Sequence, residues 1–163
     1  MADGAHAVTL RRARPQDAGV LAEMSRDLIE AGLAWRYTPR RMALLIRERE
    51  TMALVACEGD TQLIVGFAIM HFGDETAHLT LLAVNARQQR QGIGRGLIDW
   101  LIESARVAGM QSIDLEMRAD NTGASAFYER LGFVETKRTP AYYDGRLPAR
   151  HMMLRLSSQP PLT

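Results

Sequence analysis

The fold is decided by the stretch LTLLAVNARQQRQGIGRGL, which runs from Leu79 to Leu97. It begins as an apolar strand, passes through a polar turn and continues as an amphipathic helix. The apolar positions of that helix recur every fourth residue: Ile93, Leu97, Leu101 and Ala105. The stretch therefore predicts a strand, a turn and a helix in direct succession.

Three glycines stand where this helix begins: Gly92, Gly94 and Gly96. Glycine destabilises a helix, so their presence needs a reason, such as a ligand that comes close to the backbone. Free N–H groups and the positive end of the helix dipole make a helix start suitable for phosphate. Three arginines add positive charge: Arg87, Arg90 and Arg95. We predict a pyrophosphate-binding turn, with tight helix packing as the alternative reason for the glycines.

Two common phosphate motifs match this turn less well. Gly92, Gly94 and the later acid Asp114 match the dinucleotide-binding fingerprint. Its third glycine is missing, because Leu97 stands at that position. The polar run before the glycines is also too long for that motif's tight turn. The P-loop is excluded, because no Gly-Lys-Ser/Thr follows.

Length and composition limit the classes of protein that the chain can belong to. Its 163 residues favour a single domain over 1–163, with flexible tails at 1–7 and 157–163. A net charge of +1 argues against general affinity for nucleic acid or membrane, and no apolar run is long enough to span a bilayer. The single cysteine, Cys57, excludes an internal disulfide and is typical of a cytoplasmic protein. The four histidines show no metal-ligand spacing, so we expect no metal.

The pattern of apolar residues and turn signals predicts a mixed α/β fold. We expect strands over Val8–Ala13, Met52–Cys57, Leu63–Phe72, Ala77–Val84, Ser112–Arg118, Phe133–Lys137 and Arg150–Leu156. We expect helices from Val20 to near Gly32, from Pro39, from the glycine turn to Gly109, and from Asn121 to Gly132. A helical crossover makes the fourth and fifth strands parallel, whereas the hairpins around them are antiparallel. The fold class is a mixed, mostly antiparallel sheet of about seven strands with helices on both faces.

Two segments resemble a known family. Gln89–Gly94, QRQGIG, matches the Gln/Arg-x-x-Gly-x-Gly/Ala signature of the GNAT superfamily of N-acetyltransferases. Asn121–Phe133, NTGASAFYERLGF, resembles the second block of that family, and the likeness covers Met52–Leu156. Within the family, Leu115–Arg118 and Tyr128 stand at the spacing of the bacterial ribosomal-protein alanine N-acetyltransferases.

The resemblance implies acetyl-CoA as the acetyl donor and an amine as the acceptor. It implies that backbone groups of Leu82, Ala83 and Val84 hold the pantetheine and acetyl groups. The residues that it places at the coenzyme's pyrophosphate are Gln89, Arg90, Gln91, Gly92, Ile93, Gly94 and Arg95. Asn121 and Tyr128 complete the coenzyme contacts that we expect.

Direct acetyl transfer needs a base for the amine and an acid for the leaving thiolate. Tyr128 is the candidate acid, because tyrosine is protonated at neutral pH; we expect it to point away from the apolar pair Phe127 and Leu131. Glu116 is the candidate base, with a salt bridge to Arg118 or deprotonation through a water chain as alternatives.

The acceptor is predicted to enter between two connections that carry aromatic residues. Trp35 and Tyr37 lie in the connection Gly32–Pro39, and Tyr142 lies in a loop expected over Thr139–Pro148. Plain packing is the alternative role for these rings. Two histidines, His71 and His78, are interpreted as solvated or packed, with an approach of either to the site as the alternative.

We therefore predict an acetyl-CoA-dependent N-acetyltransferase without a covalent enzyme intermediate. The acceptor is a peptide or protein α-amine or, as the alternative, the amine of an amino acid, polyamine or antibiotic. An inactive coenzyme A-binding module is a further alternative. The sequence leaves open whether the chain is a monomer or a homodimer.

Overall fold

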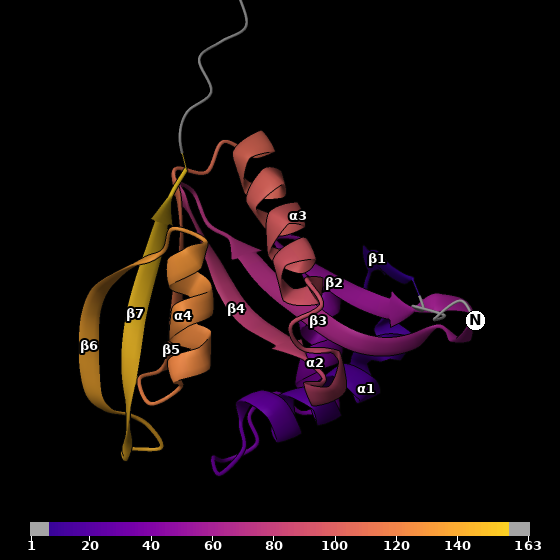
Figure 1. Cartoon of the computed structure of the whole chain (residues 1–163), viewed down its shortest axis with the longest axis horizontal. Coiled ribbons are helices and arrows are strands. Elements are labelled where there is room, and N and C mark those ends of the chain that lie inside the picture. The colour runs from indigo at the N-terminus through magenta and orange to yellow at the C-terminus, as the bar shows by residue number, and fades with distance from the viewer. Residues whose placement is uncertain (1–6, 157–163) are drawn as a thin grey trace, which may run out of the picture. The chain divides into compact units, whose positions relative to one another are not determined.

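The computed structural model describes residues 7–156, which form seven strands and four α-helices (Figure 1). The strands are β1 (Val8–Arg12), β2 (Thr51–Glu58), β3 (Leu63–Phe72), β4 (Thr76–Val84), β5 (Ser112–Arg118), β6 (Val134–Tyr143) and β7 (Leu147–Arg155). The helices are α1 (Ala18–Met24), α2 (Pro39–Arg47), α3 (Ile93–Val107) and α4 (Thr122–Arg130). The predicted tails lie outside the described residues except for Ala7, whose carbonyl oxygen accepts a hydrogen bond from the Gly59 N–H at 2.8 Å. No helix among the described residues is long and apolar enough to cross a membrane.

The strands form one sheet in the order β1-β2-β3-β4-β5-β7-β6. β4 and β5 run parallel, with His78 opposite Asp114, as expected of two strands joined by a helical crossover. β1 and β2, β5 and β7, and β6 and β7 are antiparallel pairs. The predicted fold class is confirmed.

The chain folds into two compact units, each built from segments that are separate in the sequence. The first contains the chain up to Met70 together with Leu81–Leu101. The second contains His71–Thr80 and the chain from Ile102 onward. The strand β4 therefore contributes its first half to the second unit and its second half to the first.

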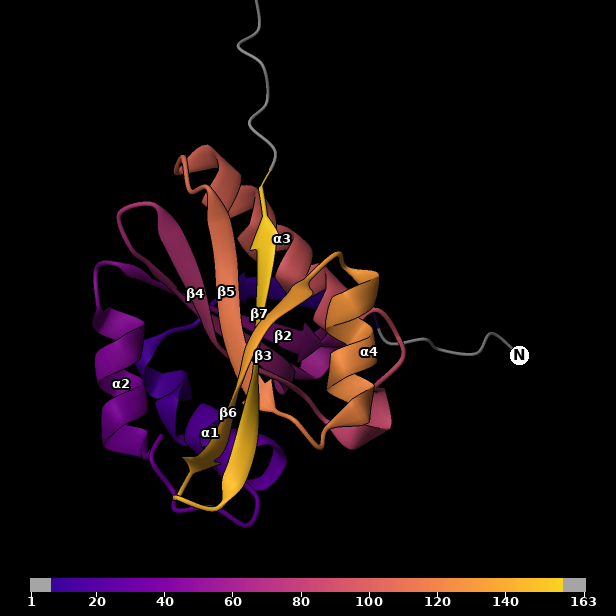
Figure 2. The ribbon, with the colours of Figure 1, turned by 90° about the vertical axis from the view of Figure 1, so that its left-hand side faces the viewer.

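The core of the first unit lies between the helices α1 and α2 and one face of its strands (Figure 2). Alternating residues of each strand point into it, as the pleat of a strand requires. The buried residues of this core include Leu21, Ala22, Met42, Val55, Cys57, Phe67, Ile69, Leu81 and Ala83. Gly66 of β3 allows β4 to approach closely, because a Cβ there would lie 3.1 Å from the carbonyl oxygen of Ala83 and 3.4 Å from the Cγ2 of Ile93 at the start of α3.

The second unit packs α4 against one face of β5. Ser125 of α4 donates a hydrogen bond to the sulfur of Met117 at 3.7 Å. The Glu129 carboxylate of the same helix pairs with Arg150 of β7 at 2.9 Å. Because side chains alternate along a strand, Glu116 lies on the face of β5 opposite to Met117 and hence to α4.

The predicted loop over Thr139–Pro148 is wrong. Thr139–Tyr143 continues β6 and Leu147–Pro148 begins β7, so only Asp144–Arg146 connects the two strands. Pro140 is tolerated because β6 is an edge strand and its register with β7 shifts between Thr139 and Tyr143. Sequence reasoning took this proline for a loop signal.

The helix expected from Val20 to near Gly32 changes its winding at Met24. From Ser25 to Ile29 the chain forms a π-helical turn, in which the Glu30 N–H donates to the Ser25 carbonyl at 2.8 Å. The Ser25 hydroxyl also donates to the Glu30 carboxylate, at 2.9 Å. Short π-helical turns of this kind occur often at functional sites.

Candidate active site

The glycine turn of the first unit leads from the end of β4 into α3. Arg90 and Gly92 both have positive φ, 67° and 79°, and a Cβ on Gly92 would meet nothing within 4 Å. A Cβ on Gly96 would make only an ordinary contact, at 3.5 Å, with Leu10. Backbone conformation therefore explains Gly92, and helix packing explains neither of these two glycines.

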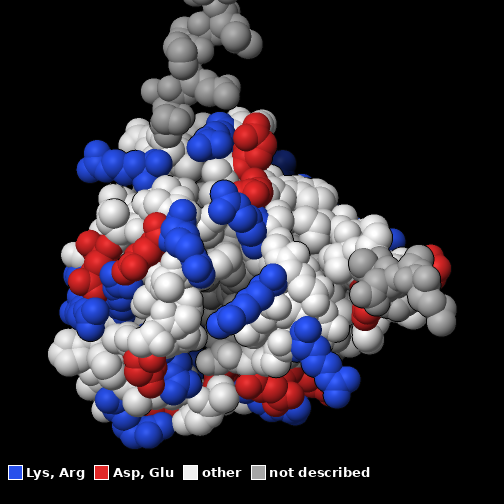
Figure 3. All heavy atoms as spheres, in the orientation of Figure 1, with Lys and Arg blue, Asp and Glu red and all other residues white. Residues whose placement is uncertain are grey.

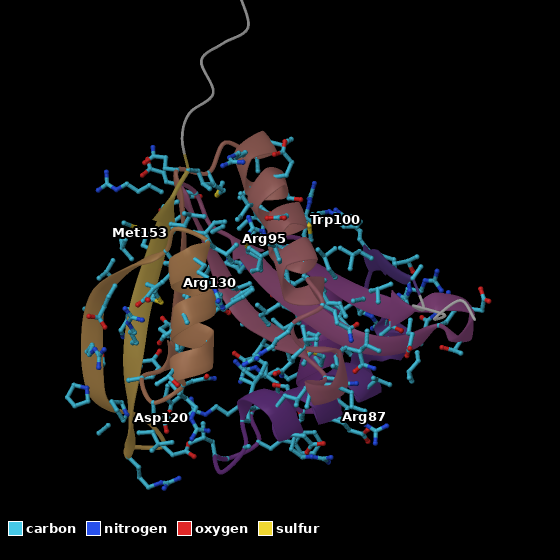
Figure 4. The ribbon with its side chains drawn as sticks, in the orientation of Figure 1. Arg87, Arg95, Trp100, Asp120, Arg130 and Met153 are labelled. Atoms are coloured by element: carbon cyan, nitrogen blue, oxygen red, sulfur yellow. The ribbon has the colours of Figure 1, made fainter. Side chains whose placement is uncertain are left out.

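The arginines of this turn face outward. Arg87, Arg90 and Arg95 are all exposed. Figure 3 shows Lys and Arg side chains at the surface over this segment, and Figure 4 labels Arg87 and Arg95. Arg95 has one acidic neighbour on its own helix, Asp99, at 3.9 Å. An outward-facing helix start with exposed guanidinium groups suits a pyrophosphate.

The end of β4 is tied to the glycine turn by a side chain. The Gln89 amide nitrogen donates to the Val84 carbonyl oxygen at 3.0 Å, and the Asn85 N–H donates to the Val65 carbonyl of β3 at 2.8 Å. Ala83 is buried, whereas Leu82 and Val84 are half-buried. The first bond fixes the turn to the end of β4, and the second fixes the residue after β4 to β3.

The Glu116 carboxylate of the second unit lies between two histidines from neighbouring strands. His78 of β4 places its Nε2 3.2 Å from Glu116 Oε2, and His151 of β7 places its Nδ1 3.9 Å from Oε1. The other ring nitrogen of His78, Nδ1, contacts the Asp114 carboxylate. The guanidinium of Arg118, the alternative partner of Glu116, lies 3.5 Å from the Asp120 carboxylate.

This arrangement sets the charge of both partners. Two carboxylates, Glu116 above all, raise the pKa of His78 from 6.5 to about 9. The His78 imidazolium in turn lowers the pKa of Glu116, helped by His151 and Lys137 and opposed by burial. At neutral pH His78 is therefore a cation and Glu116 an anion.

Tyr128 is the buried residue of α4, with 8% of its surface exposed. Its ring makes edge-to-face contacts with Phe127 and Phe133, at centroid distances of 5.2 and 5.5 Å. The expectation that Tyr128 points away from the apolar side of α4 is wrong, since Tyr128 itself is the side chain that α4 buries. Burial raises the pKa of the Tyr128 phenol, so the hydroxyl keeps its proton, and no other described residue hydrogen-bonds to it.

Asn121 caps the N-terminus of α4, because its side-chain oxygen accepts a hydrogen bond from the Ala124 N–H at 3.0 Å. The cap fixes the start of the helix that carries Tyr128. A contact between Asn121 and the coenzyme stays a prediction.

Each aromatic residue expected at the acceptor has a polar or charged neighbour. The Arg26 guanidinium lies 5.3 Å from the centre of the Trp35 ring, and that of Arg41 lies 4.5 Å from Tyr37. In the second unit, the Tyr142 ring stands edge-to-face with His151 at 5.6 Å. Tyr142 therefore belongs to the group of side chains around Glu116.

Sequence reasoning missed His151 and gave an approach of His78 to the site only as an alternative. Both lie on strands, but only the register places them beside Glu116: His151 stands opposite Glu116, and His78 stands opposite Asp114. The sequence offered one signal, the alternation of β4, which puts His78 on the half-buried side of that strand.

Comparison with known proteins supports the family resemblance found in the sequence. The model of the acetyltransferase (GNAT) family matches residues 21–133. The chain belongs to this family. The enzyme class and the resemblance predicted from the two sequence segments are confirmed, and acetyl-CoA is the co-substrate typical of the family.

Individual relatives are similar over different parts of the chain. The [ribosomal protein bS18]-alanine N-acetyltransferase of Escherichia coli K12 is 40% identical over 97 residues, which are 58% of this chain and 66% of that enzyme. N-alpha-acetyltransferase 30 of Schizosaccharomyces pombe is 30% identical over 122 residues, 72% of this chain and 80% of that protein. Ard1 from Thermoplasma volcanium superposes with a TM-score of 0.81 at 29% identity, over 93% of this chain and 99% of that one.

Proposed function

We propose that this protein transfers an acetyl group from acetyl-CoA to the α-amine at the N-terminus of a peptide or protein. The observation that carries the proposal is the position of the Glu116 carboxylate, whose Oε2 lies 3.2 Å from the Nε2 of His78 on the neighbouring strand β4. The names of the E. coli and S. pombe relatives, an alanine and an N-alpha acetyltransferase, favour an α-amine.

The ionisation of Glu116 suits an ammonium substrate. An α-amine has a pKa near 8, so about one molecule in ten is neutral at pH 7, against about one in 2,500 for a lysine side chain. A carboxylate with a lowered pKa is a weak base, but it attracts the ammonium and can take up one of its protons, which frees the lone pair with which the nitrogen then attacks. An α-amine needs only this modest help.

Tyr128 is the proposed proton donor to the leaving sulfur. In the reaction, the neutral amine nitrogen bonds to the carbonyl carbon, the carbon–sulfur bond breaks, and the Tyr128 hydroxyl proton goes to sulfur. The nitrogen loses a proton to solvent and becomes the amide, and solvent returns a proton to Tyr128. The burial of Tyr128 keeps this proton on the hydroxyl until a thiolate forms.

The glycine turn is the proposed binding site of the coenzyme. The backbone N–H groups at the start of α3 and the exposed arginines beside it suit a pyrophosphate. When bound there, acetyl-CoA supplies the thioester. The strand end at Leu82–Val84 is the proposed contact for the pantetheine and acetyl groups.

A peptide panel tests the proposal. We expect thiol release with peptides that carry a free N-terminal alanine, and none with the same peptides N-acetylated beforehand. Peptides whose only amine is a lysine side chain serve as the comparison, and small amines test the alternative acceptors. An enzyme that acetylates small amines but no peptide would contradict the proposed acceptor.

Glu116→Gln tests the base. We expect turnover of the alanine peptide to fall about 10²–10⁴-fold at pH 7, with a smaller loss at pH 9, where most of the amine arrives neutral. An equal loss at both pH values would mean that Glu116 does not act on the ammonium proton. Glu135→Gln, which removes an exposed carboxylate of β6, is the control.

A further inference from the structure

Arg150 of β7 is a mostly buried charged side chain that takes no part in the proposed chemistry. Only 12% of its side chain is exposed. Its Nη2 donates a hydrogen bond to Oε1 of Glu129 on α4, at 2.9 Å, and its Nε donates one to Oε1 of Glu135 on β6, also at 2.9 Å. One guanidinium on β7 therefore joins the helix α4 to the edge strand β6.

Strand register places Arg150 on the side of the sheet that α4 covers. Arg150 stands opposite Met117 of β5, and residues paired in this way point to the same face of a sheet. The sulfur of Met117 accepts the hydrogen bond of Ser125 on α4. The contact of Arg150 with α4 therefore follows from the pairing of β5 with β7.

The helix α4 has little apolar packing of its own. Tyr128 is the one residue of Thr122–Arg130 that is buried. No other described residue hydrogen-bonds to the Tyr128 hydroxyl, so the position of the hydroxyl depends on how the helix lies. A helix that is held by a single ring can turn about its axis unless a second contact prevents it.

The ion pair between Glu129 and Arg150 is such a second contact. Successive residues of a helix point about 100° apart, so Tyr128 and Glu129 hold α4 from two directions. Another link between α4 and the sheet, from the Ser125 hydroxyl to the Met117 sulfur at 3.7 Å, is weak because a thioether is a poor acceptor. The charged pair therefore does most to fix the rotation of the helix.

The place of Glu129 on its helix also calls for a cation. Glu129 lies in the last turn of α4, where the helix dipole disfavours a negative charge. Arg150 offsets this cost and fixes the carboxylate to β7. Loss of the guanidinium would remove the benefit and release this end of the helix from the sheet.

We propose that Arg150 is a positioning residue for the proton donor: through Glu129 it holds α4, and with it the Tyr128 hydroxyl, in place for proton transfer. This inference rests on the proposed function, because it takes Tyr128 to be the acid. All three residues belong to the second unit. A displacement of about 1 Å at a reacting group can lower a rate about a hundredfold, so a small movement of α4 is sufficient.

Arg150→Met removes the guanidinium and keeps an apolar stem. We expect the single-turnover rate with the alanine peptide to fall about tenfold or more, while the KM values for acetyl-CoA and for the peptide each stay within about twofold.

Arg138→Met is the matched control. Arg138 stands opposite Arg150 and donates to the same carboxylate, that of Glu135, at 2.6 Å, but within residues 7–156 it makes no hydrogen bond to α4. We expect this variant to keep the wild-type rate. Glu135→Gln should keep it too, because its amide oxygen still accepts the hydrogen bond from Arg150.

A double-mutant cycle with Tyr128→Phe separates positioning from plain stability. Once the hydroxyl is absent there is no proton donor to position, so Arg150→Met should cause no further fall in the rate of Tyr128→Phe. Glu129→Ala, which places a good helix former in α4, is the second variant for the case that Arg150→Met does not fold. It should reproduce the loss seen in Arg150→Met and also add nothing to Tyr128→Phe.

Two outcomes would overturn the inference. One is a folded Arg150→Met or Glu129→Ala protein with the wild-type single-turnover rate. The other is the same fall in rate in the Tyr128→Phe background as in the wild type, since a general effect on the fold would act in both. Failure of the proposed acid looks different: Tyr128→Phe by itself then keeps the wild-type rate.

Discussion

At the scale of single residues, His78 controls the charge of the proposed active site. Both of its ring nitrogens face carboxylates, and only the imidazolium can donate from both nitrogens at once. We expect His78 to titrate at a pKa of about 9 in a pH titration of the histidine ring signals by NMR. Glu116→Gln should lower this pKa, because it removes the larger of the two causes. A His78 signal that titrates near 6.5 in the wild type would contradict the arrangement.

The same pair makes stability depend on pH. The folded-state pKa of His78 lies above its unfolded value, so the pair's contribution to the free energy of unfolding is complete below about pH 6.5. It is lost as the pH rises through about 9. In urea unfolding, the difference between wild type and His78→Asn should therefore shrink over that range. His71→Asn, a change at an exposed histidine, is the comparison variant.

Tyr128→Phe keeps the buried ring and removes only the hydroxyl. We expect acetyl-CoA to bind as before, while turnover falls about 10²–10⁴-fold, or roughly 3–5 kcal/mol of barrier. Calorimetry measures the binding of acetyl-CoA. Single-turnover kinetics measure the rate of the chemical step. Phe127→Leu changes the neighbouring ring and is the packing control. Wild-type rates in Tyr128→Phe, with chemistry rate-limiting, would exclude the proposed acid.

At the scale of elements, the glycine turn depends on the backbone conformation of Gly92. Both Asp and Asn at this position would carry the same left-handed strain, about 1–2 kcal/mol, because both have a Cβ. Only Asp would add a negative charge beside a bound pyrophosphate, which costs about 1–4 kcal/mol at 4 Å. We expect Gly92→Asp to bind acetyl-CoA at least tenfold more weakly than Gly92→Asn in calorimetry. Equal affinities of the two variants would place the pyrophosphate elsewhere.

At the scale of the whole molecule, binding of the coenzyme should raise the free energy of unfolding. A ligand at a hundred times its Kd stabilises the folded state by about 2.7 kcal/mol, which for a protein of this size raises Tm by about 5–10 °C. We expect that shift with acetyl-CoA in differential scanning fluorimetry. Gly92→Asp should lose most of it and Gly92→Asn should keep most of it. No shift in the wild type would contradict coenzyme binding.

The sequence by itself determined the elements and the family. The spacing of apolar residues, the cap at Asn121 and the glycine turn are local patterns, so they predict helices, strands and turns without knowledge of contacts. The same holds for the parallel pairing of β4 and β5, because a helical crossover leaves few other topologies. Pro140 shows where local signals fail: only the position of β6 at the sheet edge decides that proline is tolerated there.

Only the tertiary structure decided which side chains meet. His78, Glu116 and His151 lie far apart in sequence and come together through strand register, which local periodicity does not encode. The direction of Tyr128 follows from which face of α4 packs on β5, and sequence reasoning took the wrong face. The burial of Glu30 depends on a π-helical turn and on a segment that folds back to it. The first two arrangements depend on residues distant in the chain, and the contacts of Glu30 join a helical turn to the irregular segment after it, so no pattern within one element could reveal them.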